Sequence, residues 1–225
     1  MQFPEQLSSV QAIDLHHLCH TYGTPLYVYD GGIIRRQVTS LQEAFAGVDM
    51  HIKYACKANT NLAILKLMRS LGVEIDVVSM GEMQMALLAG YTPQQITFTP
   101  SGVPYEEVRE AVEAGATVNV DSLPLLEWFG QTYGGGKPCL IRLKPNVAAG
   151  GNIKIMTGHR DSKFGISVDL LDKILDIVGR YGIKIIGLHQ HTGSDIKEAD
   201  AFLMASRVIF EAALRFPDLR VIDLG

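Results

Sequence analysis

The sequence has little cysteine, and the three cysteines that it has are far apart. Cys19, Cys56 and Cys139 are odd in number, and none belongs to a C-x-x-C pair. A small secreted domain held together by disulfides would be rich in cysteine, so that class is excluded. Free thiols are typical of a reducing compartment, and we expect a cytoplasmic protein.

A strong net charge and a long apolar run are also lacking. The 20 basic and 24 acidic residues leave a net charge of −4 at pH 7. This balance indicates neither nucleic acid nor an anionic membrane as a partner. The longest uncharged run, 83–105, contains prolines and glutamines, which argues against a membrane span. Residues 1–14 lack the cationic and apolar run of a signal peptide.

What the sequence does contain is typical of a folded α/β protein. Hydrophobic residues make up 47% of the 225 residues and charged residues 20%, which excludes a disordered tail. Short runs rich in β-branched residues alternate with longer amphipathic runs. We expect strands at 51–58, 73–79, 95–99, 117–121, 139–144, 184–191 and 220–224. We expect helices at 62–70, 82–89, 105–114, 123–129, 168–180 and 199–216. Glycines stand where a helix run gives way to a strand run, as helix C-caps do, at Gly72, Gly90, Gly115 and Gly182.

Such alternation predicts parallel strands, which two architectures can supply. An open dinucleotide-binding sheet would carry a glycine-rich turn after its first strand, but residues 55–59 contain no glycine. We therefore favour a (β/α)8 TIM-type barrel formed by residues 50–225, cut short after its seventh strand. Residues 1–49 are expected to pack on this barrel as a helix at 10–22, a strand at 26–29 and a helix at 33–45.

Nearly every expected strand ends in a polar or ionisable side chain. These residues are His51, Lys53, Lys57, Asp76, Asn119, Asp121, Arg142, Lys144, His189, His191 and Asp223. Active sites of β/α barrels lie at the carboxyl ends of the strands, and burying this many unpaired charges would be unfavourable. The set therefore predicts a ligand site rather than a row of solvated strand ends. A lysine that can condense with a carbonyl group and an arginine that can bind an anion favour a carbonyl or phosphate-bearing ligand.

His189 and His191 have a spacing that places both side chains on one side of a strand. Zinc or iron would need further ligands. The other histidines are poorly placed, because three precede the barrel, His51 begins its first strand and His159 lies in an insertion. We therefore expect no metal.

Five short motifs occur in the order seen in one enzyme family. They are YACKAN at 54–59, DVVSMGE at 76–82, VDS at 120–122, DSKFGI at 161–166 and GLHQHTGS at 187–194. The chain resembles the fold type III, alanine-racemase-like pyridoxal-phosphate enzymes, from about residue 24 to residue 225. Its motif order is most similar to that of the diaminopimelate decarboxylases. The resemblance implies pyridoxal 5′-phosphate as the cofactor and the barrel of that family as the fold.

The resemblance also implies roles for single residues. Lys57 would hold the cofactor covalently and His191 would stack on its ring, so these two are the predicted catalytic residues. Arg142 would approach the hydroxyl group of the ring. Asp76 and Glu82 would lie near the lysine and the ring and tune their charge.

Two further residues would bind the phosphate group of the cofactor. They are Ser194 and Gly225, the second as the first glycine of a triplet. The family continues with an acidic segment and a β-rich C-terminal domain, which places a catalytic cysteine across a dimer interface. These parts are absent from the sequence, so the chain alone is expected to be inactive and the full-length enzyme to be a homodimer.

The implied reaction is the pyridoxal-phosphate-dependent decarboxylation of meso-2,6-diaminopimelate to L-lysine, the last step of lysine biosynthesis. The run at 152–158 departs from the substrate loop of the family, which leaves open another basic amino acid such as ornithine, arginine or carboxynorspermidine. An alternative of a different class is a non-catalytic, cofactor-binding or regulatory homologue. Each of these interpretations expects a small-molecule ligand and no nucleic-acid or membrane partner.

Overall fold

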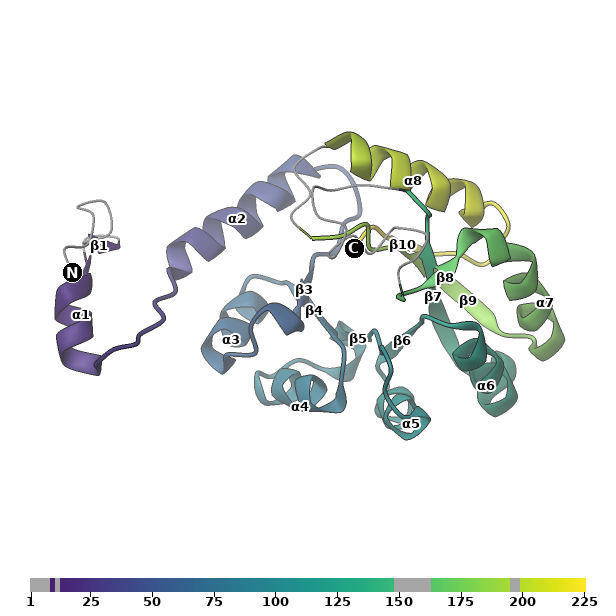
Figure 1. Ribbon diagram of the computed structural model, residues 1–225, viewed down its shortest axis with the longest axis horizontal. Helices are drawn as coiled ribbons and strands as arrows, with labels where there is room; N and C mark the ends of the chain where they lie inside the picture. The colour runs from purple at the N-terminus through teal and green to yellow at the C-terminus, as the bar shows by residue number, and fades with distance from the viewer. Residues whose placement is uncertain (1–8, 11–12, 148–162, 195–198) are drawn as a thin grey trace.

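A curved sheet of parallel strands forms the centre of the molecule (Figure 1). The computed structural model describes residues 9–10, 13–147, 163–194 and 199–225. Along the sheet the strands run in the order β10-β9-β7-β6-β5-β4-β3, and β8 pairs with β7 off this path. Their bounds are β3 (Lys53–Ala55), β4 (Glu74–Val77), β5 (Ile96–Phe98), β6 (Thr117–Val120), β7 (Pro138–Lys144), β8 (Ile166–Ser167), β9 (Lys184–His189) and β10 (Val221–Asp223). The barrel-type α/β architecture is thus confirmed, with β8 as a strand that the sequence pattern did not predict.

Helices connect consecutive strands and cover the outer face of the sheet (Figure 1). They are α3 (Leu62–Ser70), α4 (Met80–Leu88), α5 (Tyr105–Ala114), α6 (Leu123–Tyr133), α7 (Leu171–Tyr181) and α8 (Ala199–Ala213). The predicted ranges of α3 and α5 match residue for residue. The four glycines expected after helices all have positive φ angles, from 64° to 98°, as helix C-cap positions require.

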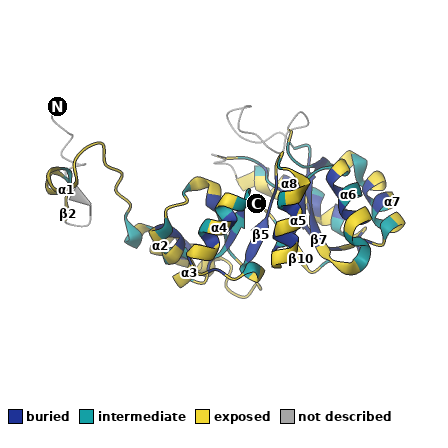
Figure 2. Cartoon of the chain, turned by 90° about the horizontal axis from the view of Figure 1, so that it is seen from below, coloured by how far each residue is buried: buried dark blue, intermediate teal, exposed yellow. Residues whose placement is uncertain are grey.

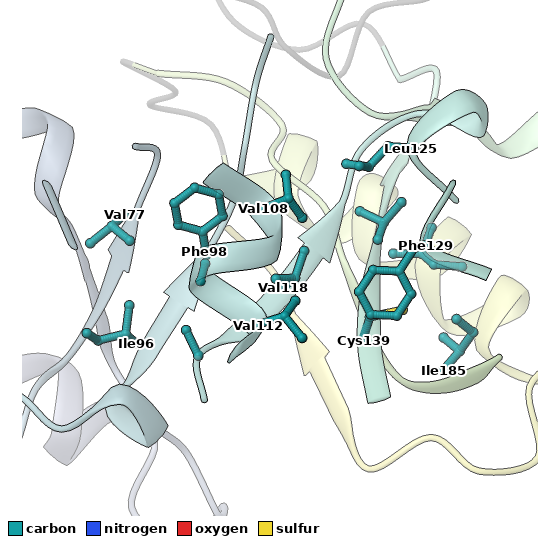
Figure 3. Close-up of a cluster of buried hydrophobic side chains, with 14 of the residues drawn as sticks. Val77, Ile96, Phe98, Val108, Val112, Val118, Leu125, Phe129, Cys139 and Ile185 are labelled. Atoms are coloured by element: carbon teal, nitrogen blue, oxygen red, sulfur yellow. The ribbon is translucent and has the colours of Figure 1, made fainter. Parts of the chain in front are cut away.

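The main hydrophobic core lies between the sheet and these helices (Figure 3). Outward-pointing strand residues such as Val77 and Phe98 are fully buried there. Phe129 of α6 belongs to the same core on the helix side, beside Cys139, and is also fully buried. Figure 2 shows the same division along the chain, with buried strands inside and exposed helix faces outside. Because alternate strand residues point to opposite faces, this core leaves the other half of the side chains to face the inside of the curve.

The N-terminal part keeps its two predicted helices but differs from its prediction in the strands. Helix α1 (Leu15–Tyr22) begins later than expected, because the Asp14 side chain accepts a hydrogen bond from the backbone N–H of His16 and so caps it. Helix α2 (Gly31–Ala44) is close to its predicted range. The predicted strand at 26–29 is wrong. Those residues are extended, but no strand of the described part pairs with them, and the Tyr27 side chain is 84% exposed.

The two helices of this part relate differently to the sheet. Helix α1 has no buried residue and lies apart from the sheet in both views (Figures 1 and 2). A short antiparallel pair, β1 (Ser9–Val10) with β2 (Ile13–Asp14), precedes it. Helix α2 instead buries Val38, and Gln42 donates a hydrogen bond to the backbone carbonyl of Leu71. Among the described helices, none combines the length and apolarity that crossing a membrane would require.

Candidate active site

A cavity opens inside the curve of the sheet, at the carboxyl ends of the strands. Its lining residues are Lys53, Ala55, Lys57, Asp76, Val78, Thr99, Arg142, His189, His191, Asp223 and Gly225. Its empty space, the open mouth included, is about 610 Å³. The strand-end argument is therefore supported by the geometry, since side chains far apart in the sequence converge on one cavity.

Lys57 reaches this cavity from a single 3₁₀ turn, Cys56–Ala58, which follows β3 directly. The turn is closed by the backbone N–H of Asn59, which donates to the carbonyl of Cys56 over 3.1 Å. The hydroxyl of Tyr54 donates to the carbonyl of Asn59 over 3.1 Å. Lys57 is exposed at the cavity while its neighbour Cys56 is fully buried. Burial raises the pKa of the Cys56 thiol to about 11, so Cys56 is a core residue and not a nucleophile.

Arg142, His189 and Asp223 form a row across three neighbouring strands. The Cα of His189 pairs with Arg142 on one side and with Asp223 on the other. Burial lowers the pKa of Arg142, while the carboxylates of Asp121, Asp76 and Asp223 act in the opposite direction. The Arg142 guanidinium also lies 5.2 Å from the centre of the Phe164 ring. The row therefore holds a nearly buried cation at the wall of the cavity.

Both cavity histidines are neutral at pH 7. Burial lowers the pKa of His189 to about 4, with Asp223 opposing and Arg142 adding to the effect. Burial likewise lowers the pKa of His191 to about 4, assisted by the positive charges of Lys57 and Arg142. An uncharged imidazole can stack on an aromatic ligand without repelling the nearby cations.

Asp76 stands at the end of β4, half-buried, opposite these groups. Burial raises the pKa of its carboxyl group to about 6, and a hydrogen bond with Thr99 counteracts this. Within the described part of the chain, Oδ1 of Asp76 and Nδ1 of His189 have no hydrogen-bond partner. Buried polar atoms without partners are uncommon, and these two belong to residues that line the cavity. They are available to a polar ligand.

This donor set fits pyridoxal phosphate. The Lys57 amine can react with an aldehyde, Arg142 can bind an oxyanion, and the neutral His191 ring can lie against an aromatic ring. The open mouth and the two partnerless polar atoms leave both space and hydrogen-bonding capacity.

Gly225 closes the cavity beside His191. Its φ angle is 86°. A Cβ added there would overlap the carbonyl oxygen of Gln190 and lie 2.9 Å from the Cα of His191. The backbone of Gly225 thus packs directly on the segment that carries His191, and only glycine fits at this position.

The structure does not place Glu82 and Ser194, two other predicted site residues, in the cavity lining. The Glu82 carboxylate accepts a hydrogen bond from the Val78 N–H over 2.9 Å, and the Ser79 hydroxyl accepts one from the Glu82 N–H over 3.3 Å. This reciprocal capping holds the turn after Asp76. Ser194 is exposed and adjoins residues 195–198, which lie outside the described residues.

Of the polar residues that line the cavity, Thr99 was absent from the predicted strand-end set, and Lys53, His189 and Asp223 belonged to that set without an assigned role. Strand alternation could have assigned Lys53 to the site, because this pattern places Lys53 and Lys57 on the same face. The run at 152–158 and the first two residues of the 161–166 motif lie outside the described residues. Among the described residues, no group of three or more His, Cys, Asp or Glu side chains could hold a metal ion.

Comparison with known proteins places the chain in a family. The family model for the pyridoxal binding domain of pyridoxal-dependent decarboxylases matches residues 32–224. The chain belongs to this family. The pyridoxal cofactor predicted from the motifs is thereby confirmed at the level of the domain.

Similar proteins carry a more specific name. The diaminopimelate decarboxylase of Methanothermobacter thermautotrophicus is 35% identical over 204 residues, which are 90% of this chain and 48% of the relative. The diaminopimelate decarboxylase of Bacillus subtilis is 35% identical over 230 residues, with 96% of this chain and 52% of the relative covered. A crystal structure of diaminopimelate decarboxylase from Helicobacter pylori complexed with L-lysine superposes with a TM-score of 0.85 at 32% identity. That superposition covers 93% of this chain and 56% of the other. The chain spans about half the length of the curated relatives that it matches.

Proposed function

We propose that this chain is the cofactor-binding barrel of a diaminopimelate decarboxylase, which removes a carboxylate from meso-2,6-diaminopimelate to leave L-lysine. The observation that carries the proposal is the convergence of Lys57, Asp76, Arg142 and His191 on one cavity. The family membership and the relatives of about 35% identity support it.

When bound, pyridoxal phosphate acts as an electron sink for the negative charge that a departing carboxylate leaves on carbon. The residues of this chain bind and orient. In the proposal, the Lys57 amine would hold the cofactor, and the neutral ring of His191 would support the cofactor ring. Arg142 binds the ring oxygen.

The remaining predicted residues have supporting roles in the proposal. Asp76 provides a negative charge beside the lysine, and Glu82 fixes the turn that follows Asp76. Ser194 and the backbone of Gly225 bind the phosphate group. A cytoplasmic location also belongs to the proposal, and the free thiols of the three cysteines support it. A homodimeric enzyme belongs to the proposal as well.

Reductive trapping tests the cofactor site. The protein is mixed with pyridoxal phosphate, reduced with borohydride and digested, and the modified lysine is located by mass spectrometry. We expect selective modification of Lys57, and its loss in Lys57→Ala. An exchange of the exposed Lys66 for alanine is the matched control, because it removes an amine that lies on α3. Modification scattered over surface lysines would contradict the proposal.

A substrate panel tests the reaction. Release of carbon dioxide by the full-length enzyme is measured with meso-diaminopimelate, ornithine, arginine and carboxynorspermidine. We expect turnover of meso-diaminopimelate alone. Turnover of another amine would move the assignment to that substrate, and selective labelling of Lys57 without any turnover would indicate a non-catalytic homologue.

A further inference from the structure

A second lysine, Lys53, lies deeper in the same cavity than Lys57 and is not part of the proposed chemistry. It belongs to β3 and lines the cavity. Its ammonium group donates a hydrogen bond to the hydroxyl of Thr97 on β5. It is also 3.5 Å from a carboxylate oxygen of Glu74 on β4. Both partners come from strands that Lys53 does not share, so the side chain is held at two points.

The pairing register shows where this ammonium group lies. Lys53 is paired with Glu74, and Asp76, two residues further along β4, is paired with Thr97. Strand β4 runs between β3 and β5. To bond Thr97, the Lys53 side chain must therefore cross the inner face of β4, from the level of Glu74 towards the level of Asp76.

Glu74 and Asp76 are two residues apart on one strand, so their side chains leave the same face of the sheet. The Lys53 ammonium thus lies on the side of Asp76 that points away from the mouth of the cavity. We propose that Lys53 is a positioning residue that keeps the Asp76 carboxylate ionised and directed towards the ligand. This inference rests on the proposed function, because it assigns a partner to one of the residues of that site.

Other charged groups also face Asp76, and they too act on the pKa of its carboxyl group. Arg142 on β7 is a second cation whose field lowers the pKa of the Asp76 carboxyl group, and Asp223 on β10 raises it. His189 and His191 are neutral at pH 7, since burial lowers the pKa of each ring to about 4. Lys57 occupies the mouth of the cavity. Lys53 differs from these groups in being tied to Glu74 on the neighbouring strand β4 and to Thr97 on β5, the strand beyond it.

The experiment measures the titration of Asp76 directly. The full protein is labelled with carbon-13 at aspartate carboxyl groups and titrated by NMR, and Asp76→Asn identifies the signal. We expect Lys53→Met to raise the midpoint of Asp76 by about one pH unit, as loss of a nearby cation does. Lys53→Arg keeps the positive charge, so its Asp76 midpoint should lie close to that of the unaltered protein. Lys66→Met on the exposed face of α3 is the matched control and should leave the midpoint unchanged.

Glu74→Gln provides a test with the opposite sign. It frees the Lys53 ammonium from one carboxylate, so the midpoint of Asp76 should fall. If the two substitutions only loosened the barrel, Lys53→Met and Glu74→Gln would shift the Asp76 midpoint in the same direction. That result would overturn the inference. An unchanged midpoint in a folded Lys53→Met protein would overturn it equally.

Cofactor affinity gives a second readout. For pyridoxal phosphate, Lys53→Met should raise the Kd up to about tenfold near pH 6 and leave it unchanged at pH 8.5, where Asp76 is ionised in both proteins. An equal increase at both pH values would assign Lys53 a purely structural role. Borohydride trapping at Lys57 in the unaltered protein is the separate check on the proposed function: if it succeeds while the Asp76 midpoint does not respond, only the inference fails.

Discussion

The two faces of the same strands have opposite characters. On the outer face Val77, Phe98 and Ile141 are fully buried against helices. On the inner face Asp76, Thr99 and Arg142 are polar and line a cavity. Each polar residue stands one position from an apolar one in the sequence. One alternation thus serves both purposes, since the outer residues hold the sheet to its helices and the inner residues remain free for chemistry.

The difference also appears in how polar atoms are satisfied. The outer core consists of apolar side chains that need no partner. The inner face keeps partnerless polar atoms on Asp76, Asn119 and His189, within the described part of the chain. A protein optimised only for stability would not retain them, because each unpaired buried group is unfavourable. Substitutions on the two faces should therefore change stability with opposite sign.

The largest effect is expected on the outer face, at Phe129. This side chain of α6 is fully buried, and its ring centre lies 5.0 Å from that of Tyr133. Phe129→Ala should lower the free energy of unfolding by about 3–5 kcal/mol through the cavity that it leaves. Urea unfolding measures this loss, with Phe129→Leu as a milder control. Below the new melting temperature, borohydride labelling of Lys57 should persist, and its selective loss in a folded protein would show that the two faces are not independent.

An inner-face substitution should instead stabilise the protein. Burial raises the pKa of Asp76 from 3.8 to about 6, so ionised Asp76 destabilises the folded state above pH 4, and fully so above pH 6. Asp76→Asn removes this destabilisation and should raise the free energy of unfolding by up to about 3 kcal/mol at pH 8. The gain should vanish towards pH 4. Urea unfolding at pH 8 and pH 5 checks the trend, while cofactor binding should weaken. A gain of equal size at both pH values would point to packing rather than charge.

The buried histidines should produce the reverse pH dependence. Burial lowers the pKa of His189 from 6.5 to about 4, so its contribution to stability is complete above pH 6.5 and is lost as the pH falls towards 4. Between pH 7 and pH 4.5, the free energy of unfolding should therefore fall by about 2–3 kcal/mol less for His189→Gln than for the unaltered protein. His17→Gln, at an exposed position of α1, is the control. Parallel pH profiles for His189→Gln and the unaltered protein would contradict this expectation.

The outer face and the helix ends were predictable because their signals are local. Apolar periodicity located α3 and α5 to the residue, and glycines marked the helix ends. The strand-end argument also brought Lys57 and Arg142 to one cavity, because parallel strands end at a common edge. The resemblance to a known family then added roles that residue types alone could not supply.

The errors arise where the outcome depends on partners far away in the chain. The extended run at 26–29 has the composition of a strand, but a strand also needs a neighbour, and none is present among the described strands. The two-residue strand β8 exists only through its pairing with β7. The role of Lys53 depends on the register of β3, β4 and β5, which no local pattern encodes.

The smallest effect is expected outside both faces, where charges are solvated. Arg215 forms an ion pair of 3.0 Å with Asp172 of α7, and the two side chains are 51% and 90% exposed. Water screens such a pair, so Arg215→Ala should change the free energy of unfolding by less than about 1 kcal/mol, and by less still in 1 M salt. Urea unfolding at low and high salt makes the measurement, with Asp172→Asn as the partner variant. A loss comparable to that of Phe129→Ala would mean that the contact between α7 and the chain after α8 supports the sheet, and the contrast between buried and solvated charge would then not account for this part of the molecule.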